Sequence, residues 1–269
     1  MSVDTAAAFF ECDMTIGESH QFAGGESVVF SAPSPVKTTP NEDAVPLLPT
    51  SEASGILAVA DGVRGNRCGA ETVRLAIHAL EAALRSFSNR GGHLSSSSVK
   101  GLDNATEAVS RFGGGAAPTM AAVEISGGVA RPYHVDDSMA LIVGDRDKIK
   151  LQTVSHSSVG YAVEAGVLEE NEALHHKDRH LVSNLVGTEA MRIEIASAIR
   201  LAPRDTVIVA SDGLFDNLRI DEIVENFRKG PLQWAVRKVI DHCRTRMQSP
   251  VEGLPAKPDD FTFILFRQS

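Results

Sequence analysis

Two apolar runs along the chain share one form: each is short, contains β-branched residues and stops at an Asp-Gly pair. Residues 56–60 lead into Asp61 and Gly62, and residues 206–210 lead into Ser211 and Asp212. Runs of this length without helical spacing are typical of buried strands. An Asp-Gly pair is also a common hairpin turn. The pattern therefore predicts two interior strands that each end at an aspartate. The two Asp-Gly pairs could be simple turns, or their aspartates could form a shared site.

Four other segments carry apolar residues at the spacing of one helix face, and they lie at 73–87, 99–112, 220–227 and 232–243. We expect Phe112 to face the core with the rest of its helix. The low-complexity residues 89–98 predict a flexible connection, and the glycines at 113–115 predict the end of the second helix.

Between these helices the pattern changes to period two. Four runs predict successive strands of an antiparallel meander, at 120–125, 129–135, 138–144 and 148–154. Further strands are expected at 25–30 as a first edge strand, and at about 192–200, 205–211 and 261–266. The proline-rich residues 31–40 predict an extended loop, and residues 156–185 are polar and helical in pattern.

Composition narrows the class of protein. A chain of 269 residues with 43% hydrophobic content can bury a substantial core, and its net charge of -9 argues against a nucleic-acid surface. Three cysteines without CxxC spacing indicate a reducing compartment and no zinc centre. No apolar run approaches the roughly 20 residues of a membrane span, and no leader pattern opens the chain. We expect a cytoplasmic protein without a membrane or nucleic-acid partner; the oligomeric state stays open.

Acids also gather at other predicted strand ends. The full set is Glu42, Asp43, Asp61, Asp136, Asp137, Asp212, Asp259 and Asp260. Hard divalent cations such as Mg²⁺ and Mn²⁺ prefer oxygen ligands. Carboxylates brought together from several strand ends would provide such a site.

The order and spacing of these acidic motifs resemble a known family. The motifs are NEDA at 41–44, ADG at 60–62, PTMA at 118–121, DDSMA at 136–140, SDGLFDNL at 211–218 and DDFT at 259–262. Together they are similar to the metal-dependent serine/threonine phosphatases of the protein phosphatase 2C (PPM) family, over about residues 38–266. The SDGLFDN and DDFT motifs are most similar to the branch with the mitochondrial and the bacterial stage-II sporulation enzymes.

The resemblance implies an α+β fold, a four-layer α-β-β-α sandwich with two antiparallel sheets flanked by helices. It implies a single catalytic domain over residues 1–269, with a flap at about 156–190 that influences substrate choice. The implied enzyme is a protein-serine/threonine phosphatase. It would hydrolyse phosphoserine and phosphothreonine in a protein substrate through a metal-bridged hydroxide, without a phosphoenzyme.

The same resemblance implies two Mg²⁺ or Mn²⁺ ions and a third, weaker one beside Asp137 and Asp212. Asp61 would bridge the two ions, and Asp61 and Asp212 would be the catalytic acids. The implied metal ligands are Glu42, Asp43, Asp61, Gly62, Asp137, Asp212 and Asp259.

The chain departs from the family pattern around the substrate phosphate. Thr38 stands where family members have an arginine, so we expect Lys37 or Arg64 to contact the phosphate. Lys37 fits a solvated loop lysine equally well. Val63 stands where some members have a histidine, which leaves no general acid among the side chains named. Asp136 replaces a family glycine.

These departures leave other functions open. A catalytically silent phosphatase-like module could use the same cleft to bind a phosphorylated partner. Another two-metal phosphoesterase, such as a nuclease, conflicts with the acidic charge. A zinc site at His175, His176 and His180 lacks cysteines, and adjacent histidines on a helix point to different faces. The substrate, the opposing kinase and the metal used cannot be read from the sequence.

Overall fold

The computed structural model describes residues 6–62, 68–88, 93–113, 115–144, 148–173, 176–178, 184–189 and 191–268. Several residues on which predictions fall lie outside the described residues, namely Val63, Arg64, His175 and His180.

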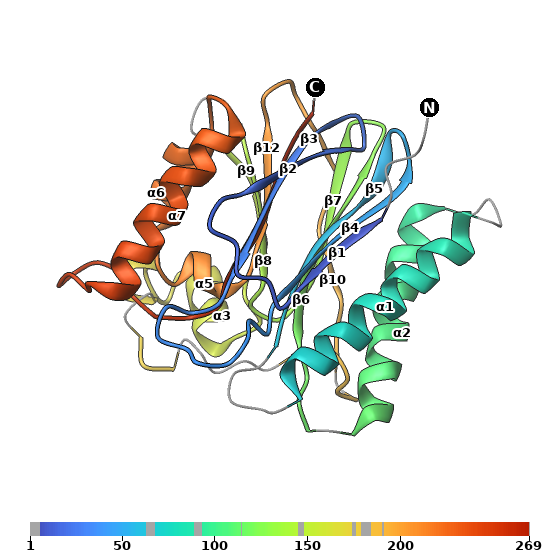
Figure 1. Cartoon of the computed structure of the whole chain (residues 1–269), viewed down its shortest axis with the longest axis horizontal. Coiled ribbons are helices and arrows are strands. Elements are labelled where there is room, and N and C mark those ends of the chain that lie inside the picture. Colours follow the sequence, from blue (N-terminus) through green and yellow to red (C-terminus); the bar gives the residue numbers. More distant parts are fainter. Residues whose placement is uncertain are drawn as a thin grey trace.

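Two antiparallel sheets form the centre of the described chain (Figure 1). The first sheet contains, in spatial order, β1 (Ala7–Phe10), β4 (Ala44–Ser51), β5 (Ser54–Asp61), β6 (Thr119–Ser126), β7 (Val129–Val135) and β10 (Glu194–Ile195), with β11 (Ile199–Arg200) also paired to β7. The second contains β2 (Glu18–Phe22), β3 (Gly25–Ala32), β13 (Phe261–Gln268), β12 (Thr206–Ala210), β8 (Met139–Val143) and β9 (Ile149–Gln152).

Helices cover the outer faces of both sheets (Figure 1). The long helices α1 (Gly69–Ser88) and α2 (Leu94–Phe112) lie on the first sheet, and α6 (Ile220–Phe227) and α7 (Leu232–Gln248) lie on the second. Three short helices complete the set in the described part of the chain: α3 (Ser158–Glu164), α4 (Glu170–Ala173) and α5 (Asp212–Phe215). The predicted four-layer sandwich is confirmed.

Strand β5 shows why the apolar run at 56–60 does not alternate. Leu57 and Val59 belong to the cluster between the sheets, whereas Ile56 and Ala58 belong to the cluster under α1 and α2. Both faces of this strand are therefore buried, and an uninterrupted apolar sequence is the consequence.

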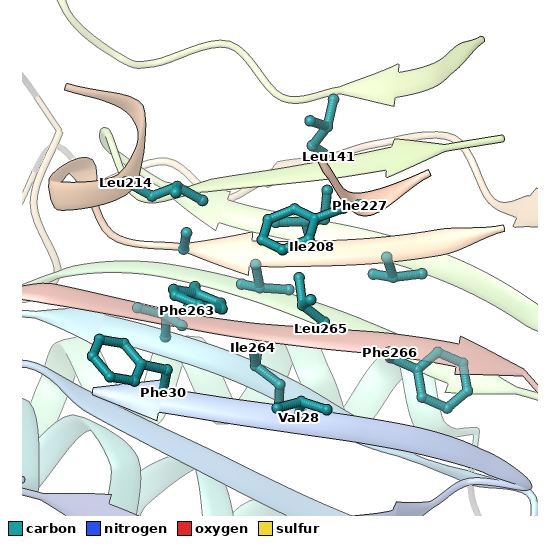
Figure 2. Packing of buried hydrophobic residues seen from close by; sticks show 14 of the residues in the cluster. Val28, Phe30, Leu141, Ile208, Leu214, Phe227, Phe263, Ile264, Leu265 and Phe266 are labelled. Carbon is teal, nitrogen blue, oxygen red and sulfur yellow. The ribbon is translucent and has the colours of Figure 1, made fainter. Parts of the chain in front are cut away.

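The inner cluster continues through the second sheet to α6 and α7. Figure 2 shows Phe30, Ile208 and Phe263 among its side chains, with Phe227 of α6 packed nearby. Phe227 and Phe263 have ring centroids 5.9 Å apart. Burial of each such side chain stabilises the fold by about 1.5–3 kcal/mol relative to exposure, so this cluster holds the strands whose ends carry the acids.

The sequence patterns missed several elements and misplaced others. Strand β3 is interior, between β2 and β13, and is not the predicted first edge strand. Strands β1, β2 and β4 had no clear period in sequence; β4 contains two prolines. The predicted four-strand meander is interrupted, because the chain crosses from the first sheet to the second between β7 and β8.

Helix α2 also differs from its prediction. It begins at Leu94, so the serines at 95–98 are helical and not part of a flexible connection. Ser98 is buried and donates its hydroxyl to the carbonyl oxygen of Leu94. Phe112 is 43% exposed and does not face the core. The predicted end is confirmed at Gly113, whose φ of 68° is the left-handed conformation that glycine favours.

Candidate metal centre

The acids from the first sheet lie at one end of adjacent strands. Asp61 is the last residue of β5, and Asp43 comes directly before β4. Because Ala44 pairs with Ala60 in this antiparallel register, Asp43 and Asp61 lie next to each other. Asp43 is buried, at 1% exposure.

The second sheet brings its acids to the same end. Asp212 follows β12 and Asp259 precedes β13, and the register pairs Ala210 with Phe263. The hydroxyl of Ser211 donates to Oδ2 of Asp43 at 2.9 Å, which joins the acid ends of the two sheets.

Electrostatic coupling shows that these acids form one cluster. Burial first, and then the charges of Asp43, Asp212, Asp137 and Asp259, raise the pKa of Asp61 well above its usual range. The cluster therefore combines acids from both sheets and from the connection that joins them.

Two neighbouring acids are shifted for the same reasons. Burial, followed by the charge of Asp260, raises the pKa of Asp43 to about 8. Burial, followed by the charges of Asp212 and Asp216, raises the pKa of Asp137 to about 8. Several carboxylates held together away from water favour protonation unless a cation lies among them.

The crossing between the sheets positions Asp137. Asp136 adopts a φ of 81°, a conformation that disfavours a side chain, and its N–H donates to Nδ1 of His156 at 3.0 Å. Burial and the charge of Asp137 raise the pKa of Asp136 to about 9. Asp136 therefore adopts a backbone conformation that glycine favours, at the position where the family pattern has a glycine.

The cluster contains oxygen atoms that suit a cation. Oδ1 of Asp43, Oδ1 of Asp137 and both carboxyl oxygens of Asp136 are buried without a hydrogen-bond partner in the described structure. Buried polar atoms normally have a partner. All of these donors are hard oxygens, the type that Mg²⁺ and Mn²⁺ prefer, so the residues fit a divalent ion.

Gly62 has close neighbours that leave little room for a side chain. A Cβ placed there would lie 3.0 Å from the main chain of Gly69 and 3.1 Å from Cβ of Glu42. A glycine therefore allows the chain after β5 to pass close to the Glu42 loop.

Lys37 and Lys257 lie at the edges of the cluster. The sequence analysis identified only Lys37 as a candidate. Lys37 donates to Oε2 of Glu42 at 2.6 Å and to Oδ2 of Asp260 at 2.5 Å. Its side chain is 15% exposed, so the alternative of a solvated loop lysine is wrong.

The second lysine, Lys257, donates to Oδ2 of Asp212 at 2.5 Å and to Oδ2 of Asp216 at 2.7 Å, and it lies 3.2 Å from Oδ2 of Asp259. Its place two residues before Asp259 was the sequence signal that could have identified it.

A groove of about 860 Å³ opens beside the acids. Asp137, Asp212 and Asp216 line one side, and residues of α3, among them Gly160 and Glu164, line another. The segment predicted as a flap therefore forms one wall of this groove.

A second group of ligand-type side chains lies near the crossing: His134, His156 and Glu194 have ligand atoms within 4.8 Å of one another. The sequence did not indicate it. Nε2 of His134 lies 2.8 Å from the carbonyl oxygen of Val154, and Nδ1 of His156 accepts from the Asp136 N–H. Both Nε2 atoms therefore carry protons, and the group does not present a metal-ligand set.

Two other expectations concern the whole chain. No disulfide joins the cysteines of the described chain, Cys12, Cys68 and Cys243. Among the described residues, no helix combines the length and the apolar character needed to cross a membrane.

Comparison with known proteins now identifies the family. The family model described as protein phosphatase 2C matches residues 36–247. The chain belongs to the protein phosphatase 2C family. A relative from Streptococcus pyogenes serotype M6, described as of protein phosphatase 2C type, is 34% identical over 111 residues, which are 41% of this chain and 44% of that protein. The match thus spans less than half of the curated relative.

Solved structures of protein phosphatase 2C type share the fold. The serine/threonine phosphatase of S. agalactiae has a TM-score of 0.76 at 22% identity, covering 91% of this chain and 100% of that one. The catalytic domain of the phosphatase PstP, in complex with two manganese ions, has a TM-score of 0.66 at 20% identity, covering 90% of this chain and 96% of that one.

Proposed function

We propose that this chain hydrolyses phosphoserine and phosphothreonine in proteins with the help of Mg²⁺ or Mn²⁺. The observation that carries the proposal is the set of buried carboxyl oxygens without a partner, on Asp43 and Asp137, beside Asp61 at the joint end of two sheets. Carboxylates held close together away from water, with some of their oxygens unpaired, gain most from a divalent cation. The manganese ions of the related PstP domain support the same choice of cofactor.

The proposed ligand set follows the placement of the acids. Two ions would be held by Asp43, Asp61, the carbonyl oxygen of Gly62, Asp212 and Asp259, with Glu42 acting directly or through water. When bound, such ions lower the pKa of a water molecule and offset charge on the phosphoryl oxygens. Asp61 and Asp212 are the proposed catalytic acids, and Asp137 with Asp212 flanks a third cation position.

Other residues of the chain would orient the substrate. We propose that the groove between the acids and α3 receives the peptide, within a single catalytic domain over residues 1–269 whose flap spans about 156–190. The ammonium of Lys37 already donates to two carboxylates, and its third donor is the proposed phosphate contact. Arg64 is the second candidate. An unchanged Michaelis constant for a phosphopeptide in Arg64→Ala would remove Arg64 from this role.

A silent binding module is the second candidate function. The observation that favours it is the neutralisation of the acids by the chain itself, through Lys37 and Lys257. Such a module would bind a phosphorylated partner in the groove without cleaving it.

The deciding experiment titrates Mn²⁺ and, separately, Mg²⁺ into metal-free protein and measures hydrolysis of p-nitrophenyl phosphate and a phosphothreonine peptide. Asp61→Asn and Asp212→Asn are the test variants, and Asp103→Asn, at an exposed position on α2, is the matched control. We expect metal-dependent activity in wild type and control, and its loss in both test variants. Metal binding without turnover would favour the silent module, and wild type without metal binding would overturn the proposed centre.

A further inference from the structure

The ammonium of Lys257 lies among three carboxylates, donating to Asp212 and Asp216 and forming an ion pair with Asp259. An ammonium group has three N–H donors and no acceptor. Asp212, Asp216 and Asp259 place one oxygen each at 2.5, 2.7 and 3.2 Å from Nζ. Asp212 and Asp259 are the acids assigned above to a divalent ion, so Lys257 and the metal share the same ligands.

The main chain of Lys257 is fixed as firmly as its side chain. The side-chain amide of Asn217, which is fully buried, accepts from the Lys257 N–H at 2.9 Å and donates to the Lys257 carbonyl oxygen at 2.8 Å. The same amide donates to the carbonyl oxygen of Gly213 in α5. The loop before β13 is thereby tied to the helix that carries Asp212 and Asp216.

Removing the ammonium from this position would leave an unfavourable arrangement. Three partly buried carboxylates would face one another, with side-chain exposures of only 15–17%. Like charges in such a setting repel strongly because water screens them poorly. A lysine ammonium is a compact point charge, so it can neutralise this side of the cluster as a cation would.

We propose that the ammonium of Lys257 is a built-in cation of this centre. It takes the position beside Asp212 and Asp137 that a third divalent ion would otherwise occupy, so the chain binds fewer ions than its acids alone would allow. This inference rests on the proposed function, because it concerns the same centre. It gives Lys257 a positioning role: the lysine holds one oxygen of Asp212 and leaves the other for the remaining ions.

The location of the unpaired oxygens supports this division of the cluster. Asp43, one of the acids assigned to the two ions, has a buried oxygen without a partner, whereas Oδ2 of Asp212 and Oδ2 of Asp259 both face Lys257. The chain thus neutralises one side of the cluster itself and leaves the other side for metal.

The first test uses the wild-type chain and does not depend on a variant that must fold. Lysines are labelled with an amine-reactive reagent with and without saturating Mn²⁺, and the labelled sites are counted by mass spectrometry. We expect Lys257 to stay unlabelled in both states, whereas the exposed Lys100 labels in both. Labelling of Lys257, either without metal or on addition of Mn²⁺, would overturn the proposal, because it would show that the ammonium leaves its three carboxylates.

The second test counts bound Mn²⁺ by calorimetry and by elemental analysis. We expect Lys257→Gln to bind one more ion per chain than wild type, and Lys257→Arg, which keeps the positive charge, to bind the wild-type number. Equal numbers in wild type and Lys257→Gln would contradict the inference. A wild-type chain that binds no Mn²⁺ would instead contradict the proposed function, whatever the labelling of Lys257 shows.

Discussion

The main-chain N–H of Asp136 donates to Nδ1 of His156 at 3.0 Å, and the main-chain N–H of His156 donates back to the carbonyl oxygen of Asp136 at 3.1 Å. Nδ2 of Asn184 lies 2.6 Å from the same Nδ1. Because Nδ1 accepts, the ring proton is on Nε2, which lies 3.1 Å from Oε2 of Glu194. The ring of His156 therefore holds the turn that presents Asp137.

Replacement of His156 tests whether its ring holds the turn at Asp136. His156→Phe keeps a ring stacked on His134, where the centroids are 4.4 Å apart, but it removes the acceptor for Asp136 and Asn184. Each buried donor left unsatisfied costs roughly 1–3 kcal/mol. We expect urea unfolding to show a loss of about 2–4 kcal/mol, against less than about 0.5 kcal/mol for the exposed control His78→Phe. A loss of stability no larger than that of the control would show that the His156 ring does not hold this turn.

We expect Asp136 to lower the free energy of unfolding of the metal-free protein. Asp136→Gly relieves a left-handed conformation worth about 1–2 kcal/mol but adds a similar entropy cost to folding. The deciding effect is removal of a buried carboxyl without partners, worth about 1–3 kcal/mol. We expect metal-free Asp136→Gly to be more stable than wild type by about that amount in urea unfolding.

The control for this variant is Arg204→Gly, at an exposed turn residue with a φ of 73°. It changes a similar backbone conformation without removing a buried carboxyl, so we expect a change within about 0.5 kcal/mol. Equal effects of the two substitutions would mean that backbone strain alone matters at Asp136.

Asp61 should show opposite effects on stability and on metal binding. Asp61→Asn removes one acid from a partly buried cluster in which the acids repel one another, so we expect the metal-free variant to melt at a higher temperature than metal-free wild type. Saturating Mn²⁺ should raise the melting temperature of wild type and of the exposed control Asp103→Asn, and hardly change that of Asp61→Asn. A variant that Mn²⁺ stabilises as strongly as wild type would show that Asp61 is not a ligand.

The parts of this molecule that the sequence predicts well are those with local signals. Buried strands at 56–60 and 206–210 and the helix at 220–227 follow from uninterrupted apolar runs and helical spacing, which depend on neighbouring residues only. Strand β4 was missed because Pro46 and Pro49 contradict strand propensity, whereas pairing with β1 and β5 outweighs it.

The site was predictable only in part, because some of its contacts join segments that are far apart in the sequence. Asp61 and Asp212 could be identified because each follows an apolar strand. The ion pairs made by Lys37 and Lys257 could not be predicted from the sequence. Lys37 pairs with a residue 223 positions away and Lys257 with one 45 positions away, and both pairs depend on which strand ends meet in the fold. The group of His134, His156 and Glu194 likewise forms only when the chain crosses between sheets.

His134 should make the protein sensitive to mild acid. Burial, with a smaller effect of His156, lowers the pKa of His134 from its ordinary value of 6.5, against the opposing effects of the Val154 carbonyl and Glu194. Below pH 6.5 the unfolded chain binds a proton at this histidine that the folded chain does not, so the contribution of His134 to the free energy of unfolding falls as the pH falls. The raised pKa values of Asp43, Asp136 and Asp137 contribute in the opposite direction. Each pH unit in this range costs at most about 1.4 kcal/mol. We expect urea unfolding at pH 7.5 and 5.5 to show that the shift to the lower pH is more favourable to His134→Gln than to wild type by about 1 kcal/mol. The amide of this variant can still donate to Val154. His78→Gln should change with pH as wild type does. Parallel changes in all three proteins would show that His134 does not titrate differently on unfolding.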